Sequence, residues 1–95
     1  MEQELLLAKN TPGAIILDVR NVDEYEKGHI PGSTNIPISK ITGVETIIQD
    51  KSTPLFVYCL SGSRSKRACS FLQKVGYTQV KNIGGISDYK GEIER

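Results

Sequence analysis

The segment Val57-Tyr58-Cys59-Leu60-Ser61-Gly62-Ser63-Arg64-Ser65 decides how this sequence folds. It begins in an apolar run, residues 55–58, typical of a strand buried on both faces. It ends in an amphipathic helix with apolar residues at helical spacing, namely Ala68, Phe71, Leu72 and Val75. Gly76 follows as a stop signal. The segment therefore predicts a strand, a tight loop of small residues and a helix, in that order.

The flanking sequence repeats this alternation. Further strands are indicated by apolar runs at residues 14–19 and 80–83, and a brief one at 34–36. Asn21 and Glu24 have capping-box spacing, and Gly28 can end the short helix that they begin. Two more helices are expected, one around Leu5, Leu6 and Leu7, and one where Ile41, Val44, Ile47 and Ile48 have helical spacing. Strands that alternate with helices predict an α/β fold, a parallel sheet of four to five strands with helices on both faces.

Size and composition allow one domain, residues 1–95. Twelve Lys and Arg against eleven Asp and Glu give a net charge of +1, which argues against a nucleic-acid-binding or membrane-surface protein. No stretch approaches the roughly 18 apolar residues of a membrane span. The acidic start, Met1-Glu2-Gln3-Glu4, lacks the basic region of a signal peptide, so a cytoplasmic location is expected.

The loop after the strand is suited to holding an anion on sulfur. In a parallel sheet, ligands bind beyond the carboxyl ends of the strands, where Cys59 stands. Inward-turned amides and the start of the following helix supply positive potential at that point. Arg64 can add a fixed charge and planar donors that match an oxyanion. These features favour the thiolate of Cys59, which is the nucleophilic form.

The second cysteine, Cys69, is expected in the core, because it lies inside the predicted helix with no small-residue loop beside it. A resolving thiol is the alternative, and a Cys59–Cys69 disulfide is another, although a loop and a helix between the two should hold them apart. For Cys59 itself the alternative is a small buried hydrophobe that ends a strand. Two cysteines and one histidine at unrelated spacings do not indicate a metal site.

From Ile15 to about Tyr89 the sequence resembles the single-domain rhodaneses. Three stretches carry the resemblance: Leu17-Asp18-Val19-Arg20 followed by Glu24-Tyr25, then Gly28-His29-Ile30-Pro31-Gly32-Ser33-Thr34-Asn35-Ile36-Pro37, and then Val57-Tyr58-Cys59 with Gly62, Arg64 and Ser65. Gly84-Gly85-Ile86 resembles the family's last turn, although Tyr89 stands where the family often has Trp.

The resemblance implies a sulfurtransferase with Cys59 as its catalytic residue. Cys59 would take sulfane sulfur from thiosulfate or a persulfide and pass it to a thiol, or to cyanide in an assay, without a metal or organic cofactor. A donor or acceptor protein is a possible further partner. The substrate-binding residues would be those of the loop, namely Leu60, Ser61, Gly62, Ser63, Arg64 and Ser65.

One departure from the family and the length of the loop bear on the substrate. Thiosulfate-using members often carry Arg or Lys after the catalytic cysteine, where this chain has Leu60, so we expect weak thiosulfate binding and a persulfide donor. Cys59 to Arg64 spans six residues, one fewer than in the cell-cycle phosphatases that resemble this family, which disfavours phosphatase activity.

Only residues 1–14 precede the first strand, where many members have an extra strand, so four strands and an exposed edge beside the last strand are expected.

Other residues are expected to support the site. Asp18 could accept hydrogen bonds that orient the loop, and Arg20 could pair with Glu24 or Glu26. His29 is expected to be a hydrogen-bonded structural residue, with a general base as the alternative, in a segment where Pro31-Gly32 suits a type II turn. Lys66 and Arg67 would form a solvated face or receive an acidic partner.

Two other functions stay open at this point. The chain could be a persulfide carrier with little turnover of its own, or a rhodanese-like docking module of a larger protein.

Overall fold

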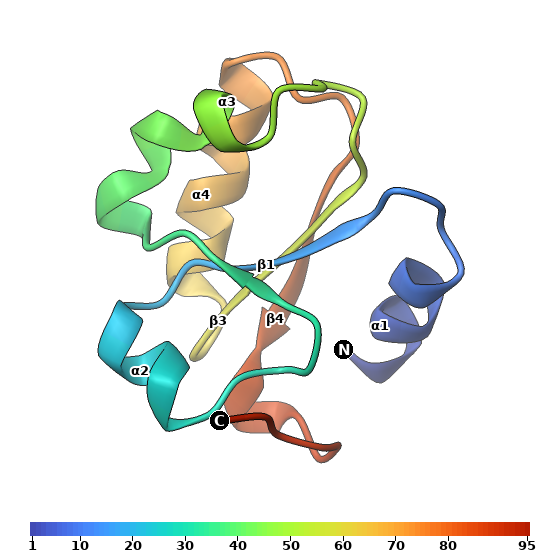
Figure 1. The fold of residues 1–95 in the computed structure, drawn as a ribbon, viewed down its shortest axis with the longest axis vertical. Helices are drawn as coiled ribbons and strands as arrows, with labels where there is room; N and C mark the ends of the chain where they lie inside the picture. The colour runs from blue at the N-terminus through green and yellow to red at the C-terminus, as the bar shows by residue number, and fades with distance from the viewer.

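A computed structural model describes residues 1–95 as an α/β fold built on one parallel sheet. The strands are β1 (Ile15–Asp18), β2 (Thr34–Asn35), β3 (Leu55–Cys59) and β4 (Val80–Gly85). Their order across the sheet is β2-β1-β3-β4, and every pairing is parallel (Figure 1). The predicted fold is confirmed, with the smaller of the two expected strand numbers. β4 has one neighbour in the sheet, so its other edge is unpaired, as expected.

Helices cover both faces of the sheet. The α-helices are α1 (Glu2–Lys9), α2 (Val22–Lys27), α3 (Val44–Ile47) and α4 (Ser63–Lys74), and the 3-10 helices are η1 (Ile38–Gly43) and η2 (Ile86–Asp88). One core lies between the sheet and α1, where Leu5 and Ala8 pack with Phe56 and Tyr58. The other core lies beneath η1, α3 and α4. No helix is long and apolar enough to cross a membrane.

β3 is the centre of both cores. All five of its residues are buried, and successive side chains point to opposite faces. Tyr58 therefore joins the α1 core, whereas Val57 and Cys59 join the α4 core. This alternation places the sulfur of Cys59 on the side of the sheet where α4 begins.

Most predicted local signals are confirmed. α4 runs from Ser63 to Lys74, and Gly76 follows with a φ of 109° that favours glycine. The backbone N–H of Asn21 donates to Oε1 of Glu24 at 3.1 Å in the expected capping box. Gly32 has a φ of 81°, as position three of a type II turn requires.

The region 41–48 differs from its prediction. It forms η1 followed by the single-turn α3 instead of one amphipathic helix, because a 3-10 helix turns every three residues and shifts the phase of the following turn. Val44 is fully buried, but Ile47 is 59% exposed. Ile48 has left the helix, with a φ of −115° and a ψ of 89°, and so returns to the core.

The carboxyl ends of three strands meet at one end of the sheet. Asp18 of β1 pairs in register with Tyr58, and Cys59 pairs with Gly85 of β4. The register between β3 and β4 shifts by one residue between Val57 and Tyr58. This β-bulge turns the end of β4 toward the loop that follows Cys59.

Candidate active site

Cys59 ends β3 without exposed surface, and the loop that follows curls around its sulfur. The backbone N–H of Gly62 donates to Sγ at 3.0 Å. Gly62 adopts a φ of 103°, a left-handed conformation that glycine accepts readily, and this conformation reverses the chain into α4. The predicted sequence of strand, tight loop and helix is confirmed here.

The loop changes the acidity of Cys59. Burial on its own would raise the pKa of the thiol, because a buried charge loses its hydration. Hydrogen bonding from the Ser65 hydroxyl and from the amides of Ser65, Gly62 and Ser61 outweighs burial and holds the pKa of Cys59 below its usual value. This lowering of the pKa agrees with the expectation that the loop favours a thiolate.

Ser65 connects the sulfur to β4. The Cys59 thiol lies 3.4 Å from Oγ of Ser65, and the Ser65 hydroxyl lies 2.8 Å from Oδ1 of Asn82. Nδ2 of Asn82 donates to the Gly62 carbonyl at 3.3 Å, and the Gly84 amide donates to Oδ1 at 3.0 Å. These two bonds fix the orientation of the Asn82 amide. Sequence reasoning missed Asn82, because it lies on another strand, 17 positions from Ser65 along the chain.

Gly85 allows β4 to touch the loop. A Cβ atom on Gly85 would lie 2.3 Å from the Leu60 carbonyl oxygen and 2.5 Å from Cα of Ser61. The backbone N–H of Ser87 also donates to that carbonyl at 3.0 Å. The Gly-Gly turn expected from the sequence is therefore a wall of the candidate site, and a residue with a side chain would push the loop away from it.

Arg64 faces a carboxylate instead of Cys59. Its Nη1 and Nη2 donate to Oε1 and Oε2 of Glu24 at 2.7 and 3.0 Å. The guanidinium lowers the pKa of Glu24 to about 2 against the effect of partial burial, and the same bond raises the pKa of Arg64. Each terminal nitrogen donates one of its hydrogens to Glu24, and the expected role of Arg64 as a planar donor to an oxyanion stays a prediction.

Arg20 pairs with Asp18, and the expected pairing with Glu24 or Glu26 is wrong. Nη2 of Arg20 lies 2.7 Å from Oδ2 of Asp18 and also donates to the Gly28 carbonyl at 2.7 Å. The reason is local, since the chain turns after β1 and the Arg20 amide also donates to Oδ1 of Asp18, at 2.8 Å. Both side chains are buried, and the hydrogen bonds of Asp18 hold this turn instead of the loop after Cys59.

His29 has the contacts of a structural residue. Nδ1 lies 2.8 Å from the Tyr25 carbonyl, and Nε2 lies 3.2 Å from Oε1 of Glu94. Its ring stacks on that of Tyr25 with centroids 3.7 Å apart. These contacts agree with the expected structural role.

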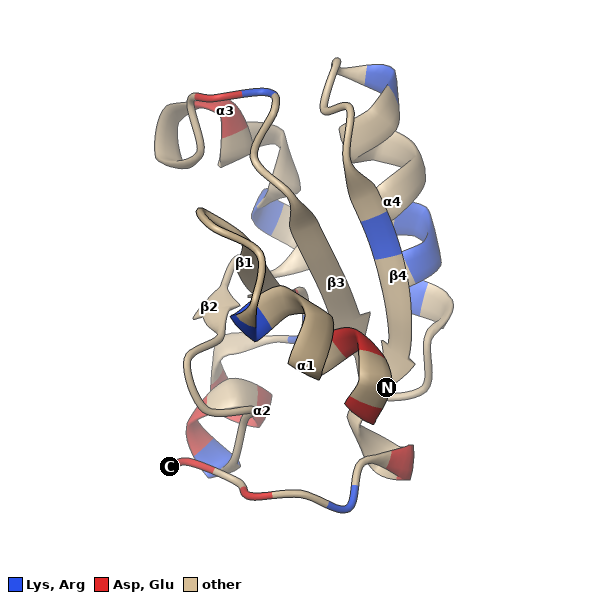
Figure 2. Cartoon of the chain, turned by 90° about the vertical axis from the view of Figure 1, so that its right-hand side faces the viewer, with Lys and Arg blue, Asp and Glu red and all other residues tan.

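The remaining predicted residues divide by exposure. Leu60 is 46% exposed at the rim of the loop, and Ser61 and Ser63 are exposed beside it. Lys66 and Arg67 are exposed in the first turns of α4, a helix with basic but no acidic residues (Figure 2). The loop backbone therefore encloses the sulfur of Cys59, whereas the side chains of Lys66 and Arg67 lie on the exposed side of α4.

Cys69 lies in the α4 core, as expected, and both cysteines are free thiols. Burial, with a smaller effect of the nearby Cys59, raises the pKa of Cys69 to about 11. No group of three or more His, Cys, Asp and Glu side chains is arranged to hold a metal ion.

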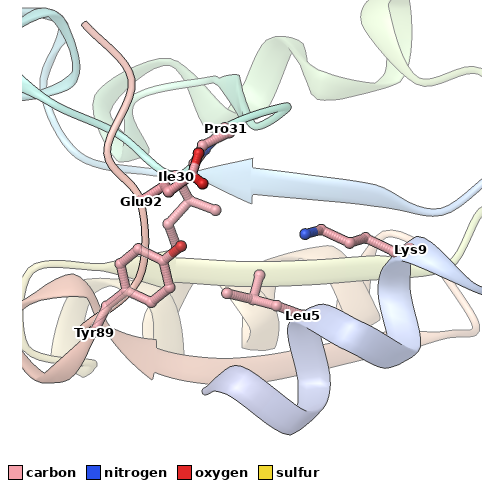
Figure 3. Close-up of a pocket in the computed structure, with 6 residues that line it drawn as sticks. All are labelled: Leu5, Lys9, Ile30, Pro31, Tyr89 and Glu92. Carbon is pink, nitrogen blue, oxygen red and sulfur yellow. The ribbon is translucent and has the colours of Figure 1, made fainter.

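A cavity of about 240 Å³ lies on the α1 side and is separate from the Cys59 loop. It is lined by Leu5, Lys9, Ile30, Pro31, Tyr89 and Glu92 (Figure 3). Tyr89 therefore packs against the α1 core and lines this cavity, which the loop after Cys59 does not line.

Comparisons with known proteins agree with this geometry. The model of the rhodanese-like domain family matches residues 1–92. Thiosulfate sulfurtransferase PspE of Escherichia coli is 37% identical over 73 residues, which are 76% of this chain and 70% of PspE. The Bacillus subtilis protein named "Putative sulfur carrier protein YrkF" is 36% identical, over 83% of this chain but only 43% of its own length.

A solved structure gives the same result. The structure described as "rhodanese with anions from E. coli" has a TM-score of 0.79 and 32% identity, and the match covers 86% of this chain and 98% of that one. Several other relatives are longer proteins, and this chain spans about a quarter of an adenylyltransferase and sulfurtransferase of Ogataea parapolymorpha. The family match, the sequence relatives and the fold together show that this chain belongs to the rhodanese-like domain family.

Proposed function

We propose that this domain is a sulfurtransferase that carries sulfane sulfur as a persulfide on Cys59. The observation that carries the proposal is the hydrogen bond of 3.0 Å from the Gly62 amide to Sγ, at the start of α4. An amide and a helix start that point at sulfur stabilise negative charge there. Both the attacking thiolate and the persulfide that it forms carry that charge.

In the first half-reaction the Cys59 thiolate attacks the outer sulfur of a donor. A new S–S bond forms to Sγ while the bond between the two donor sulfurs breaks, and the electron pair leaves with the donor. Thiosulfate would leave as sulfite, and a persulfide would leave as a thiolate. Cys59 then holds one extra sulfur as Cys–S–S⁻, and no external oxidant or reductant is needed.

In the second half-reaction a nucleophile takes the outer sulfur. A thiol or cyanide attacks it, the S–S bond to Sγ breaks, and the electron pair returns to Cys59 as a thiolate. Because the donor product leaves before the acceptor reacts, the kinetics should be ping-pong. The chemistry needs no metal or organic cofactor.

The loop from Leu60 to Ser65 is the proposed substrate-binding segment. Its contributions differ, because the Gly62 amide and the Ser65 hydroxyl reach the sulfur, whereas Leu60, Ser61 and Ser63 form the exposed rim. A reactive thiol persists in a reducing compartment, so a cytoplasmic location belongs to the same proposal.

A persulfide carrier is the second candidate function. Cys59 has no exposed surface, so an added sulfur there would be covered until an acceptor docks. The name of one relative points the same way, since it is called a putative sulfur carrier protein. A protein donor or acceptor would then be the main partner.

One assay separates the two candidates. The purified domain is incubated with thiosulfate or glutathione persulfide and then with cyanide, and thiocyanate is measured, with Cys59→Ser and Cys69→Ser as the variant and its matched control. Turnover that needs Cys59 but not Cys69 supports the enzyme. An extra sulfur on the Cys59 peptide by mass spectrometry, without turnover, supports the carrier. A Cys59 that gains no sulfur from either donor contradicts both.

A further inference from the structure

Two arginines at the carboxyl end of the sheet are already paired with carboxylates. Arg20 is bound to Asp18, and Arg64 is bound to Glu24. The next cations along the chain, Lys66 and Arg67, are exposed, whereas the buried face of α4 carries Ser65. A dianion that entered the loop would therefore meet amides and a hydroxyl but no unpaired guanidinium.

The contacts of the ion pair between Glu24 and Arg64 favour a stable pair. It is bidentate, both side chains are about three-quarters buried, and Oε1 of Glu24 also accepts the Asn21 amide at 3.1 Å. Charge-assisted bidentate pairs of this kind are stronger than single hydrogen bonds. The depressed pKa of Glu24, about 2, keeps its carboxylate charged throughout the physiological range. Glu24 thus competes with any substrate anion for Arg64.

We propose that Glu24 is a positioning residue that sets donor specificity: by holding Arg64, it keeps the guanidinium from the anion site, so that Cys59 takes sulfur from singly charged persulfides in preference to dianionic donors. The inference rests on the proposed function and names the substrate class of the same site. It also explains how a loop that contains an arginine can be poorly suited to thiosulfate. Leu60 at the rim adds no charge to compensate.

Glu24→Gln is the variant that tests this role. Glutamine keeps the length of the side chain and an oxygen that can accept the Asn21 amide, so the helix cap is retained while the charge is lost. Glu26→Gln is the matched control, because Glu26 lies on the same helix and is exposed. The double variant Glu24→Gln/Arg64→Gln shows whether an effect depends on the released guanidinium. If Glu24→Gln proves unfolded by circular dichroism, Glu24→Met takes its place.

The first measurement uses sulfate, a tetrahedral dianion with no sulfur to transfer. Its affinity is obtained from the protection of Cys59 against iodoacetamide. We expect about tenfold tighter sulfate binding in Glu24→Gln, since a hydrogen-bonded charge contact contributes roughly that factor at a partly exposed site. Glu26→Gln should match the unmodified protein, and the double variant should lose the gain. Equal sulfate affinity in Glu24→Gln and the unmodified protein, or a gain that survives in the double variant, would overturn the inference.

The second measurement compares two sulfur donors. In Glu24→Gln the KM for thiosulfate should fall by about tenfold, while the KM for cysteine persulfide, whose net charge is −1 with its ammonium and carboxylate ionised, should change much less. A parallel fall for both donors would contradict the inference. If no donor places sulfur on Cys59 but sulfate affinity responds as expected, the proposed function fails while the role of Glu24 at the anion site stands. The two failures are therefore distinguishable.

Discussion

The two cysteines of this chain are both buried, yet their surroundings give them opposite chemistry. Cys59 ends a strand where the loop amides and the Ser65 hydroxyl point at its sulfur, and its pKa lies below the usual value. Cys69 lies two turns into α4 among apolar side chains, and its pKa rises to about 11. Burial acts in the same direction at both sites. Hydrogen-bond donors aimed at the sulfur, not burial, therefore separate a nucleophile from a core residue.

The largest expected difference is in the labelling of the two thiols. With iodoacetamide at pH 7, Cys59 should react at least about 100-fold faster than Cys69, because a thiol with a pKa near 11 has about one part in ten thousand as thiolate. Peptide mapping by mass spectrometry measures both rates in one sample. In strong denaturant the rates should converge, and equal rates in the folded protein would break the comparison.

Gly85→Ala tests whether the loop must lie close to β4. The added methyl would meet the Leu60 carbonyl at 2.3 Å, so the loop has to shift. A displacement on the scale of an ångström should slow sulfur transfer by roughly one to two orders of magnitude. The matched control is Gly43→Ala, because an added Cβ there meets nothing within 4 Å. Steady-state turnover and circular dichroism are measured together, and undiminished turnover in Gly85→Ala would be the contrary result.

Ser65→Ala removes one of the donors that distinguish the two cysteines. The hydrogen bond between the Cys59 sulfur and the Ser65 hydroxyl lowers the pKa of Cys59, so its loss should raise that pKa. The pH profile of alkylation should then move to higher pH, with a lower rate near neutrality. Ser70→Ala, an exposed change on the same helix, serves as the control. A profile that stays in place would assign the acidity of Cys59 to the amides alone.

Cys69→Ala should have the smallest effect. The loss of one sulfur atom from the core should lower the free energy of unfolding by about 1 kcal/mol, while turnover stays within about twofold. Urea titration and the thiocyanate assay provide the two readings. A large loss of turnover without a loss of stability would point to the resolving role that the sequence left open.

Sequence reasoning succeeded where the signal is local. The strand, loop and helix around Cys59 follow from contiguous residues, as do the cap at Asn21 and the turn at Gly32. The placement of Cys69 also followed from its immediate neighbours along the helix. In each case the spacing of residues along the chain was enough to predict the local structure, without knowledge of any distant contact.

The partners that come from other elements could not be predicted in this way. Arg64 is 40 positions from Glu24, and Asn82 of β4 is 17 positions from Ser65. Tertiary geometry decides such pairings, so the charges around the loop were assigned only from the structure. Arg20 is a local exception: sequence reasoning named Glu24 and Glu26 as its partners, whereas the turn after β1 pairs it with Asp18, two positions away.

The position of Cys69 also makes this thiol a reporter of opening. Its side chain packs in the core of α4 with 8% of its surface exposed, so its labelling should accelerate when the helix leaves the sheet. If such openings are rare and brief, the labelling rate of Cys69 measures the free energy of the opened state. If the labelling rate of Cys69 is measured with and without a sulfur donor, the difference would show how much a persulfide on Cys59 stabilises the domain against opening.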